Sequence, residues 1–148
     1  MDNIAPSTID REIALQDVLL RRRSPKTFVE KSVEPEKLVS ILEAARWSPS
    51  SRNEQPWRFI VGRKERPASY ERLYDSLSAR NKLWAHQAPV LIAVVAKMFH
   101  DRDGSPNRSA LGDVGGAIAN LTVQAVALGL QVHQMAGFDA ERLRASCN

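Results

Sequence analysis

Residues 47–61 read WSPSSRNEQPWRFIV and join an amphipathic helical pattern to an apolar run that is typical of a β-strand. Between the two lies a loop rich in Ser, Asn and Gln, which is bounded by Pro49 and Pro56. Each proline fixes its own φ and favours extended geometry in the residue before it, so the loop is expected to be stiff. A stiff loop on a folded scaffold can present several hydroxyl and amide groups to one ligand. An ordinary connection between a helix and a strand explains the same composition, because Ser, Asn and Pro are common turn residues.

Length and composition indicate one globular domain over residues 1–148. No apolar run is long enough to span a bilayer, and the first residues carry Asp2 and Asp10 instead of the apolar core of a signal peptide. Cys147 is the only cysteine, so an internal disulfide is excluded. These features predict a cytoplasmic protein with no membrane partner.

The net charge is +4, and the one tight basic cluster is Arg21-Arg22-Arg23, followed by Lys26. Elsewhere basic and acidic residues are interspersed, as in residues 63–66. A nucleic-acid-binding face requires more clustering, with aromatic side chains between the basic ones, so no nucleic-acid partner is predicted. A phosphate group on a small ligand explains the arginines equally well, because guanidinium groups pair bidentately with phosphate.

Motifs for side-chain catalysis are missing from the sequence. His86, His100 and His133 fall in different predicted elements and lack the spacing of metal ligands, so no metal site is predicted. The loop serines lie in no G-x-S-x-G motif, and there is no P-loop and no G-x-G-x-x-G fingerprint. What remains is an arginine cluster, a polar loop and the amide of Asn81, which together suit an anionic cofactor that carries its own chemistry.

Hydrophobic periodicity predicts a mixture of helices and strands. The first predicted elements are a helix from Ser7 to about Arg21 with Asp10 in its capping box, a helix from Pro35 to about Arg46, and a strand over 57–61 closed by Gly62. They are followed by a helix over 70–77 that frays into 79–84 and by a central strand over 89–96. The last elements are a long helix from Ser109 or Asp113 to about Leu128 with Gly129 as its cap, a short strand over 130–135, and a helix capped by Asp139. Because the order lacks a strict βαβ rhythm, it predicts an α+β fold. Small residues in the long helix, including Gly115 and Gly116, predict tight packing that offsets their low helix propensity.

Several ordered blocks, which cover nearly the whole chain after residue 12, resemble the nitroreductase-like flavoproteins. Residues 22–28, RRSPKTF, are similar to the family signature R-R-S-x-R-x-F. The stretch 47–61 resembles the block A-x-x-A-P-S-x-x-N-x-Q-P-W-x-F, with Ser48 where Ala is common. Asn81 and the later APVLI match a third segment. Further matches, to the long central helix of the family and to the segment after it, are residues 113–117, 120–121, 124–125, 127–130 and 135–139.

The resemblance implies an α+β, nitroreductase-like fold with a central, mostly antiparallel sheet flanked by helices. It also implies a homodimer with FMN at the subunit interface and the long helix at that interface. Arg22, Arg23 and Ser24 would hold the phosphate and ribityl chain, with Lys26 near the pyrimidine end of the ring. Guanidinium groups are suited to this role because they pair with phosphate through two parallel hydrogen bonds.

A second set of positions is implied to surround the flavin ring. The loop residues Ser50, Ser51 and Asn53 would line it from the partner chain. Asn81 would contact the edge of the isoalloxazine ring. Backbone groups near the flavin N5 would come from Gln134, Ala136 and Gly137, and donors placed there tune the potential of the ring.

One departure from the family lies at the C-terminal end. Family members continue with another strand, a basic residue or pair that also grips the phosphate, and a tail that crosses onto the partner. The sequence lacks these features, so the domain is expected to be C-terminally truncated relative to the family, as either a fragment or a minimal variant. A sheet edge beside residues 130–135 or 90–95 is then expected to be exposed.

The implied function is that of an FMN-dependent oxidoreductase. A hydride would pass from NAD(P)H through flavin N5 to a small electron-poor acceptor, such as a nitroaromatic or a quinone, in a ping-pong sequence. No side chain would be catalytic, because FMN carries the chemistry and the protein positions the reactants. The alternative is a non-catalytic or degenerate flavin-binding member of the family. No motif in the sequence distinguishes NADH from NADPH.

Overall fold

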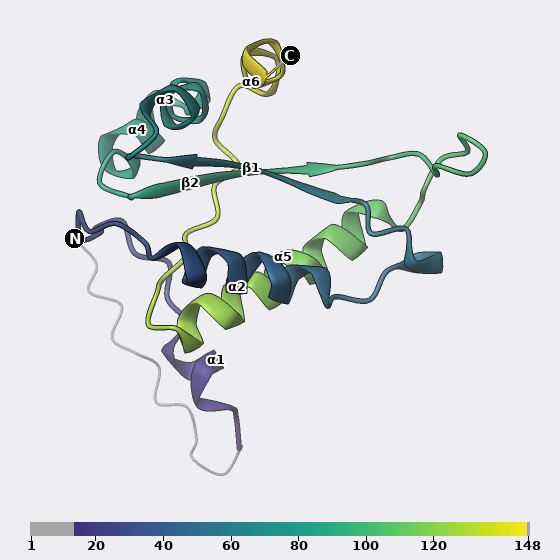
Figure 1. Ribbon diagram of the computed structural model, residues 1–148, viewed down its shortest axis with the longest axis horizontal. Helices are drawn as coiled ribbons and strands as arrows, with labels where there is room; N and C mark the ends of the chain where they lie inside the picture. The colour runs from purple at the N-terminus through teal and green to yellow at the C-terminus, as the bar shows by residue number, and fades with distance from the viewer. Residues whose placement is uncertain (1–13, 148) are drawn as a thin grey trace.

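The structure, a computed structural model, describes residues 14–147. In chain order its elements are α1 (Asp17–Arg21), α2 (Pro35–Arg46), the short 3-10 helix η1 (Ser51–Asn53), β1 (Trp57–Arg63), α3 (Pro67–Ser76), α4 (Ala79–Ala85), β2 (Val90–Ala96), α5 (Ala110–Ala127) and α6 (Ala140–Cys147). Figure 1 shows the sheet between two helical layers, with α2 and α5 on one face and α3, α4 and α6 on the other. The antiparallel sheet and its helical layers confirm the predicted α+β class.

The sheet consists of β1 and β2, paired antiparallel with Trp57 opposite Ala96 and Arg63 opposite Val90. Side chains alternate across it, so Ile92 packs towards α2 and α5 while Leu91 packs towards α3. Burial on both faces explains why β2 is apolar throughout. The prediction that β2 is a central strand was wrong, because within residues 14–147 the only strand beside β2 is β1. Helices, and not flanking strands, cover the apolar run.

The larger core cluster lies between α2, α5 and the sheet. Its buried members are Leu38, Ile41, Ala45, Trp57, Val114, Ala117, Leu121 and Ala125. The residues from α2 recur at the predicted helical spacing, and two fully buried alanines of α5 let the two helices approach closely. A Cβ on Gly116 would lie 2.8 Å from Ser48 Oγ, whereas one on Gly112 or Gly115 would meet no atom within 4 Å. Tight packing therefore explains Gly116, but the same prediction for Gly115 was wrong within this chain.

The predicted helix ends are largely confirmed. Pro35 occupies the first turn of α2. Gly129 follows α5 at φ 78°, and the Leu130 N–H donates to the Ala125 carbonyl at 2.8 Å, which is the bonding pattern of a Schellman motif. Asp139 caps α6, since its Oδ1 accepts from the Arg142 N–H at 2.9 Å. None of the helices within residues 14–147 is both long enough and apolar enough to cross a bilayer.

Four predicted boundaries differ from the structure. Residues 130–135 form no strand, because no neighbouring strand in the described range supplies a ladder for them. Residues 79–85 form a separate helix, which begins at Ser78, whose Oγ accepts from the Asn81 N–H. Strand β1 continues through Gly62 to Arg63. Within the described part of the first predicted helix, only Asp17–Arg21 is helical, and the predicted cap at residues 7–10 lies outside the described residues.

Tyr70 offers a measurable test of the second core cluster, which packs α3 and α6 against the sheet. Its hydroxyl donates to the Ala88 carbonyl at 2.8 Å and lies 3.2 Å from the Ala85 carbonyl. Burial raises the pKa of Tyr70 to about 12, so the group remains a neutral donor. We expect Tyr70→Phe to lower the free energy of unfolding by about 1–2 kcal/mol in urea titrations, because a buried carbonyl loses its donor. Tyr74→Phe is the control, since that hydroxyl is only partly buried and bonds at 3.2 Å.

Candidate functional site

Three segments that are distant in the sequence lie together beside the C-terminal end of α5. The Arg23 N–H donates to Gln131 Oε1 at 3.1 Å, and His133 Nδ1 lies 2.9 Å from the Pro25 carbonyl. The Asn81 amide donates to the Gly137 carbonyl at 2.9 Å. These contacts connect residues 21–28, helix α4 and residues 130–137, which carry the predicted residues other than those of the loop at 50–53.

An aromatic stack fixes the same three segments to one another. The Trp84 ring of α4 lies 4.4 Å from the ring of His133 and 6.3 Å from that of Phe28, measured between centroids. Because a carbonyl only accepts, the contact with Pro25 requires His133 Nδ1 to carry a proton. The stack therefore holds the backbone that leads to residues 134–137 in a fixed position.

The cations of the site are exposed and available to an anion. Arg22 Nη1 donates to Ser24 Oγ at 3.2 Å, and Arg23 Nη1 folds back onto the carbonyls of Leu20 and Arg22. Within residues 14–147 no carboxylate lies within ion-pair distance of Arg22, Arg23 or Lys26, whereas Arg21 pairs with Asp17 at 2.6 Å. The predicted phosphate-binding residues thus present uncompensated positive charge on one short segment.

The backbone around Gly137 presents further donors. Among the hydrogen bonds of the described residues, none uses the N–H of Ala136 or Gly137, and both residues are exposed. A Cβ on Gly137 would lie 2.8 Å from Asn81 Nδ2 and 2.9 Å from Ser78 Oγ. The absence of a side chain keeps the Asn81 amide in place and leaves the backbone open. This donor set fits a ring with acceptor atoms next to a phosphate, as FMN has.

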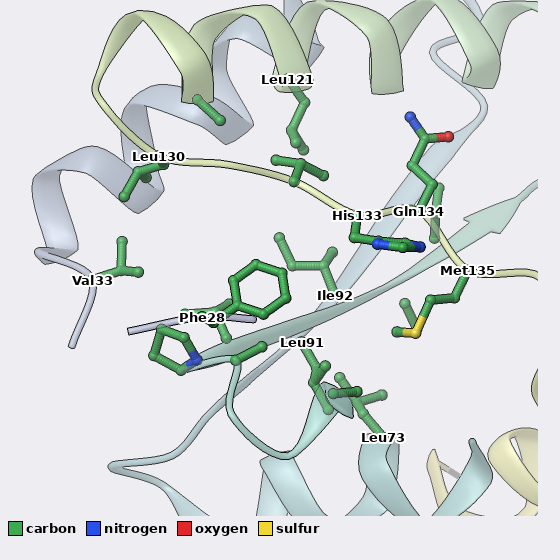
Figure 2. A pocket seen from close by; sticks show the side chains of 18 of the residues that line it. Phe28, Val33, Leu73, Leu91, Ile92, Leu121, Leu130, His133, Gln134 and Met135 are labelled. Atoms are coloured by element: carbon green, nitrogen blue, oxygen red, sulfur yellow. The ribbon is translucent and has the colours of Figure 1, made fainter. Parts of the chain in front are cut away.

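Two cavities adjoin this site. The larger, about 1120 Å³, is mostly apolar and runs along β2, and Figure 2 shows Leu121 and Leu130 above it and Leu73 below it. Of the predicted site residues it reaches only Gln134. The smaller, about 450 Å³, is lined by Ala136 and Gly137. Because it lies beside the free N–H groups, the smaller cavity is closer to the predicted ring position.

The loop residues Ser50, Ser51 and Asn53 lie elsewhere. The Ser51 N–H donates to Asp113 Oδ2 at 3.0 Å, which places the loop at the N-terminal end of α5. The segment that carries Gln131, which accepts from the Arg23 N–H, follows the other end of that helix, whose 18 residues span roughly 27 Å at 1.5 Å per residue. Within one chain the structure therefore connects the segments that carry eight of the predicted residues. The other three, Ser50, Ser51 and Asn53, lie apart from them.

Three residues of the loop adopt left-handed backbone conformations without being glycine. Their φ angles are 54° at Arg52, 57° at Asn53 and 46° at Gln55. Such conformations cost about 1–3 kcal/mol each and persist only where the surroundings enforce them. Asn tolerates this region, so only one of the three carried a sequence signal for it. Sequence reasoning also missed the role of Asp113 as an anchor of the loop, since it considered this residue as a possible helix start and as part of a family block.

The geometry defines an α+β protein with a basic segment that has no carboxylate partner, and with no cluster of three or more potential metal ligands among residues 14–147. The model of the nitroreductase family matches residues 19–82 and 62–148, and the chain belongs to that family. This confirms the family predicted from the sequence.

Solved and curated relatives agree with that assignment. A crystal structure described as an oxidoreductase containing FMN superposes with a TM-score of 0.87 at 30% identity, over 95% of this chain and 72% of that one. An uncharacterized 15.4 kDa protein of Mycolicibacterium smegmatis is 40% identical over 91 residues, which are 57% of this chain and 60% of that protein. The major NAD(P)H-flavin oxidoreductase of Aliivibrio fischeri is 42% identical over 64 residues, covering 43% of this chain and 28% of the relative. The chain thus spans less than two thirds of the length of these two curated relatives.

Proposed function

We propose that this chain binds FMN and acts as an NAD(P)H-dependent oxidoreductase of small electron-poor acceptors. The observation that carries the proposal is that residues 130–137 contact both the segment of uncompensated arginines, through Gln131, and the Asn81 amide, through Gly137. When bound, FMN supplies the redox chemistry, accepting a hydride from NAD(P)H at N5 and reducing an acceptor such as a nitroaromatic or a quinone.

The residues of the chain bind and orient the cofactor. Arg22 and Arg23 would hold the phosphate through charge-assisted hydrogen bonds, with Ser24 beside them and Lys26 near the pyrimidine end of the ring. The Asn81 amide group is fixed by its bond to Gly137, which leaves its oxygen free to meet the ring edge. Gln134, Ala136 and Gly137 would place backbone groups near N5 of the ring. None of these groups needs to transfer a proton, so the site works by positioning.

A homodimer accounts for the loop residues that lie apart. Ser50, Ser51 and Asn53 lie near one end of α5, and the segment that contacts Arg23 follows the other end. One flavin contacts both sets if the loop comes from a second copy of the chain, as the sequence predicted. Sedimentation with and without FMN tests this arrangement, and a flavin-bound monomer would contradict it.

Reconstitution followed by turnover tests the proposed function directly. Protein incubated with excess FMN and passed through gel filtration is expected to retain flavin absorbance. The flavin-loaded protein is then expected to oxidise NADH or NADPH when a nitroaromatic or a quinone is supplied. Protein that retains no flavin would contradict the proposal, and retained flavin without turnover would support the non-catalytic alternative.

Gly137→Ala isolates the contribution of the Asn81 amide. The new Cβ displaces two side-chain ends, Asn81 Nδ2 and Ser78 Oγ, and the three atoms nearest to it all belong to side chains. We therefore expect FMN affinity to fall roughly fivefold to tenfold, the loss of about one hydrogen bond, with little change in melting temperature. Gly112→Ala, which meets no atom within 4 Å, is the control. Equal FMN affinity in the two variants would show that Asn81 does not orient the ring.

A further inference from the structure

The loop at residues 50–56 requires an explanation for its stability, because it maintains three left-handed residues without a glycine. A conformation of this kind survives only if contacts from outside the loop enforce it. One bond lies within the loop, and another joins it to β1. Gln55 N–H donates to Ser50 Oγ at 3.0 Å, and the Arg58 guanidinium donates to the Gln55 carbonyl at 2.9 Å.

The most enclosed contact of the loop joins it to a segment that comes after β2. Glu54 Oε1 lies 3.2 Å from His100 Nδ1, and the two side chains are only 17% and 12% exposed. The other ion pairs of the described residues each contain at least one more exposed partner. Among the acid–base pairs of the described residues, the Glu54–His100 pair is therefore the least exposed to solvent.

His100 belongs to a hairpin formed by residues 98–107, which provides a firm support. The His100 N–H donates to the Ser105 carbonyl at 2.8 Å, and the Asn107 N–H donates to the Met98 carbonyl at 2.8 Å. Asn107 is 3% exposed, and its Oδ1 accepts from the Ser109 N–H at the start of α5. The hairpin thus connects the sheet, the imidazole of His100 and the helix that also carries the loop anchor Asp113.

The contact is short but is not a directed hydrogen bond. Nδ1 lies 3.2 Å from the Glu54 carboxylate oxygen, yet its N–H direction does not satisfy hydrogen-bond geometry. The nearby acids of the hairpin have other partners, since Asp101 pairs with Lys97 and Asp103 with Arg102.

We propose that Glu54 and His100 are positioning residues, which clamp the strained loop from the hairpin and hold Ser50, Ser51 and Asn53 in the geometry that receives the flavin of a second subunit. The flavin part of this statement rests on the proposed function, and the clamping of the loop does not. Neither residue needs to touch the cofactor, since both act through the backbone of the loop.

A double-mutant cycle in the full chain tests the clamp. Glu54→Gln preserves the shape of the carboxylate and removes its charge, and His100→Asn removes the imidazole. Each single variant is expected to speed amide hydrogen exchange at Ser51, Asn53 and Gln55 about tenfold, and the double variant is expected to be no faster than either, because the pair acts as a unit. Glu141→Gln, at a carboxylate that is 80% exposed in its pair with Arg144, is the control.

Flavin binding supplies the second readout. Both single variants are expected to weaken FMN about tenfold while melting within the range of the control, since the clamp acts on the loop and not on the core. Unchanged exchange in the single variants, or effects that multiply in the double variant, would overturn the clamp. If the parent chain binds no FMN, the proposed function fails and the exchange data still decide on the clamp. If Glu54→Gln does not fold, His100→Asn alone gives the same decision.

Discussion

Gly62→Val is expected to lower the free energy of unfolding by about 3 kcal/mol, the upper part of the range for overpacked interiors. A Cβ at this position would lie 2.8 Å from Tyr70 Cα and 2.9 Å from the Ser69 carbonyl oxygen. Both are backbone atoms of α3, so the clash is relieved only by moving the helix away from β1. Because small domains have total stabilities of about 5–15 kcal/mol, such a loss is a large fraction of the whole.

The measurement is urea denaturation of the variant beside two controls in α5. Gly112→Ala and Gly115→Ala meet no atom within 4 Å, so they are expected to gain up to about 1 kcal/mol from helix propensity. A Gly62→Val protein that unfolds at the midpoint of the parent would show that α3 does not pack this closely on the sheet. Loss of stability in all three variants would point to a general intolerance of glycine replacement.

Gly62 also shows where local sequence signals fail. In the sequence a glycine after an apolar run predicts the end of a strand, whereas here β1 continues through it and the backbone of α3 explains it. The signal for that role lies in α3, a separate element, and only the folded chain brings the two together. Residues 130–135 carry an apolar strand pattern for the same reason, because burial against a core and pairing in a ladder leave similar patterns.

Helix ends were more predictable because their causes are local. Pro35, Gly129 and Asp139 act through their own backbone or through a neighbour within one turn, and each was found where the sequence predicted it. Ser78 is an instructive omission. It is a good N-cap residue that begins α4, and recognition of it would have separated that helix from α3.

The candidate site likewise has a part that could be predicted from the sequence and a part that could not. The arginine segment, Asn81 and residues 134–137 came from a resemblance to ordered family blocks, and the structure places these segments together. What the sequence did not disclose are the contacts that hold them, such as the stack of Trp84 on His133. The strained loop was predicted to be stiff from its two prolines, but His100 and Asp113, which contact it, come from distant segments.

Arg22→Ala is expected to weaken FMN binding by one to two decades. Charge-assisted hydrogen bonds are each worth about 1.5–3 kcal/mol, and about 1.4 kcal/mol corresponds to a factor of ten in the dissociation constant. The Arg22 guanidinium is exposed, donates to Ser24 Oγ, and has no carboxylate partner within residues 14–147. Its charge is therefore available to a phosphate instead of being neutralised within the chain.

Flavin titration of a matched pair of variants decides the assignment. Arg21→Ala removes an arginine from the same cluster, but that side chain already pairs with Asp17, so its effect on FMN is expected to stay within about twofold. Arg22→Lys retains the charge without the planar fork and is expected to fall between the parent and Arg22→Ala. Equal dissociation constants for Arg21→Ala and Arg22→Ala would show that the cluster attracts the phosphate only through the summed positive charge of its arginines, and not through a specific hydrogen bond from Arg22. A dissociation constant of Arg22→Ala equal to that of the parent would remove Arg22 from the site altogether.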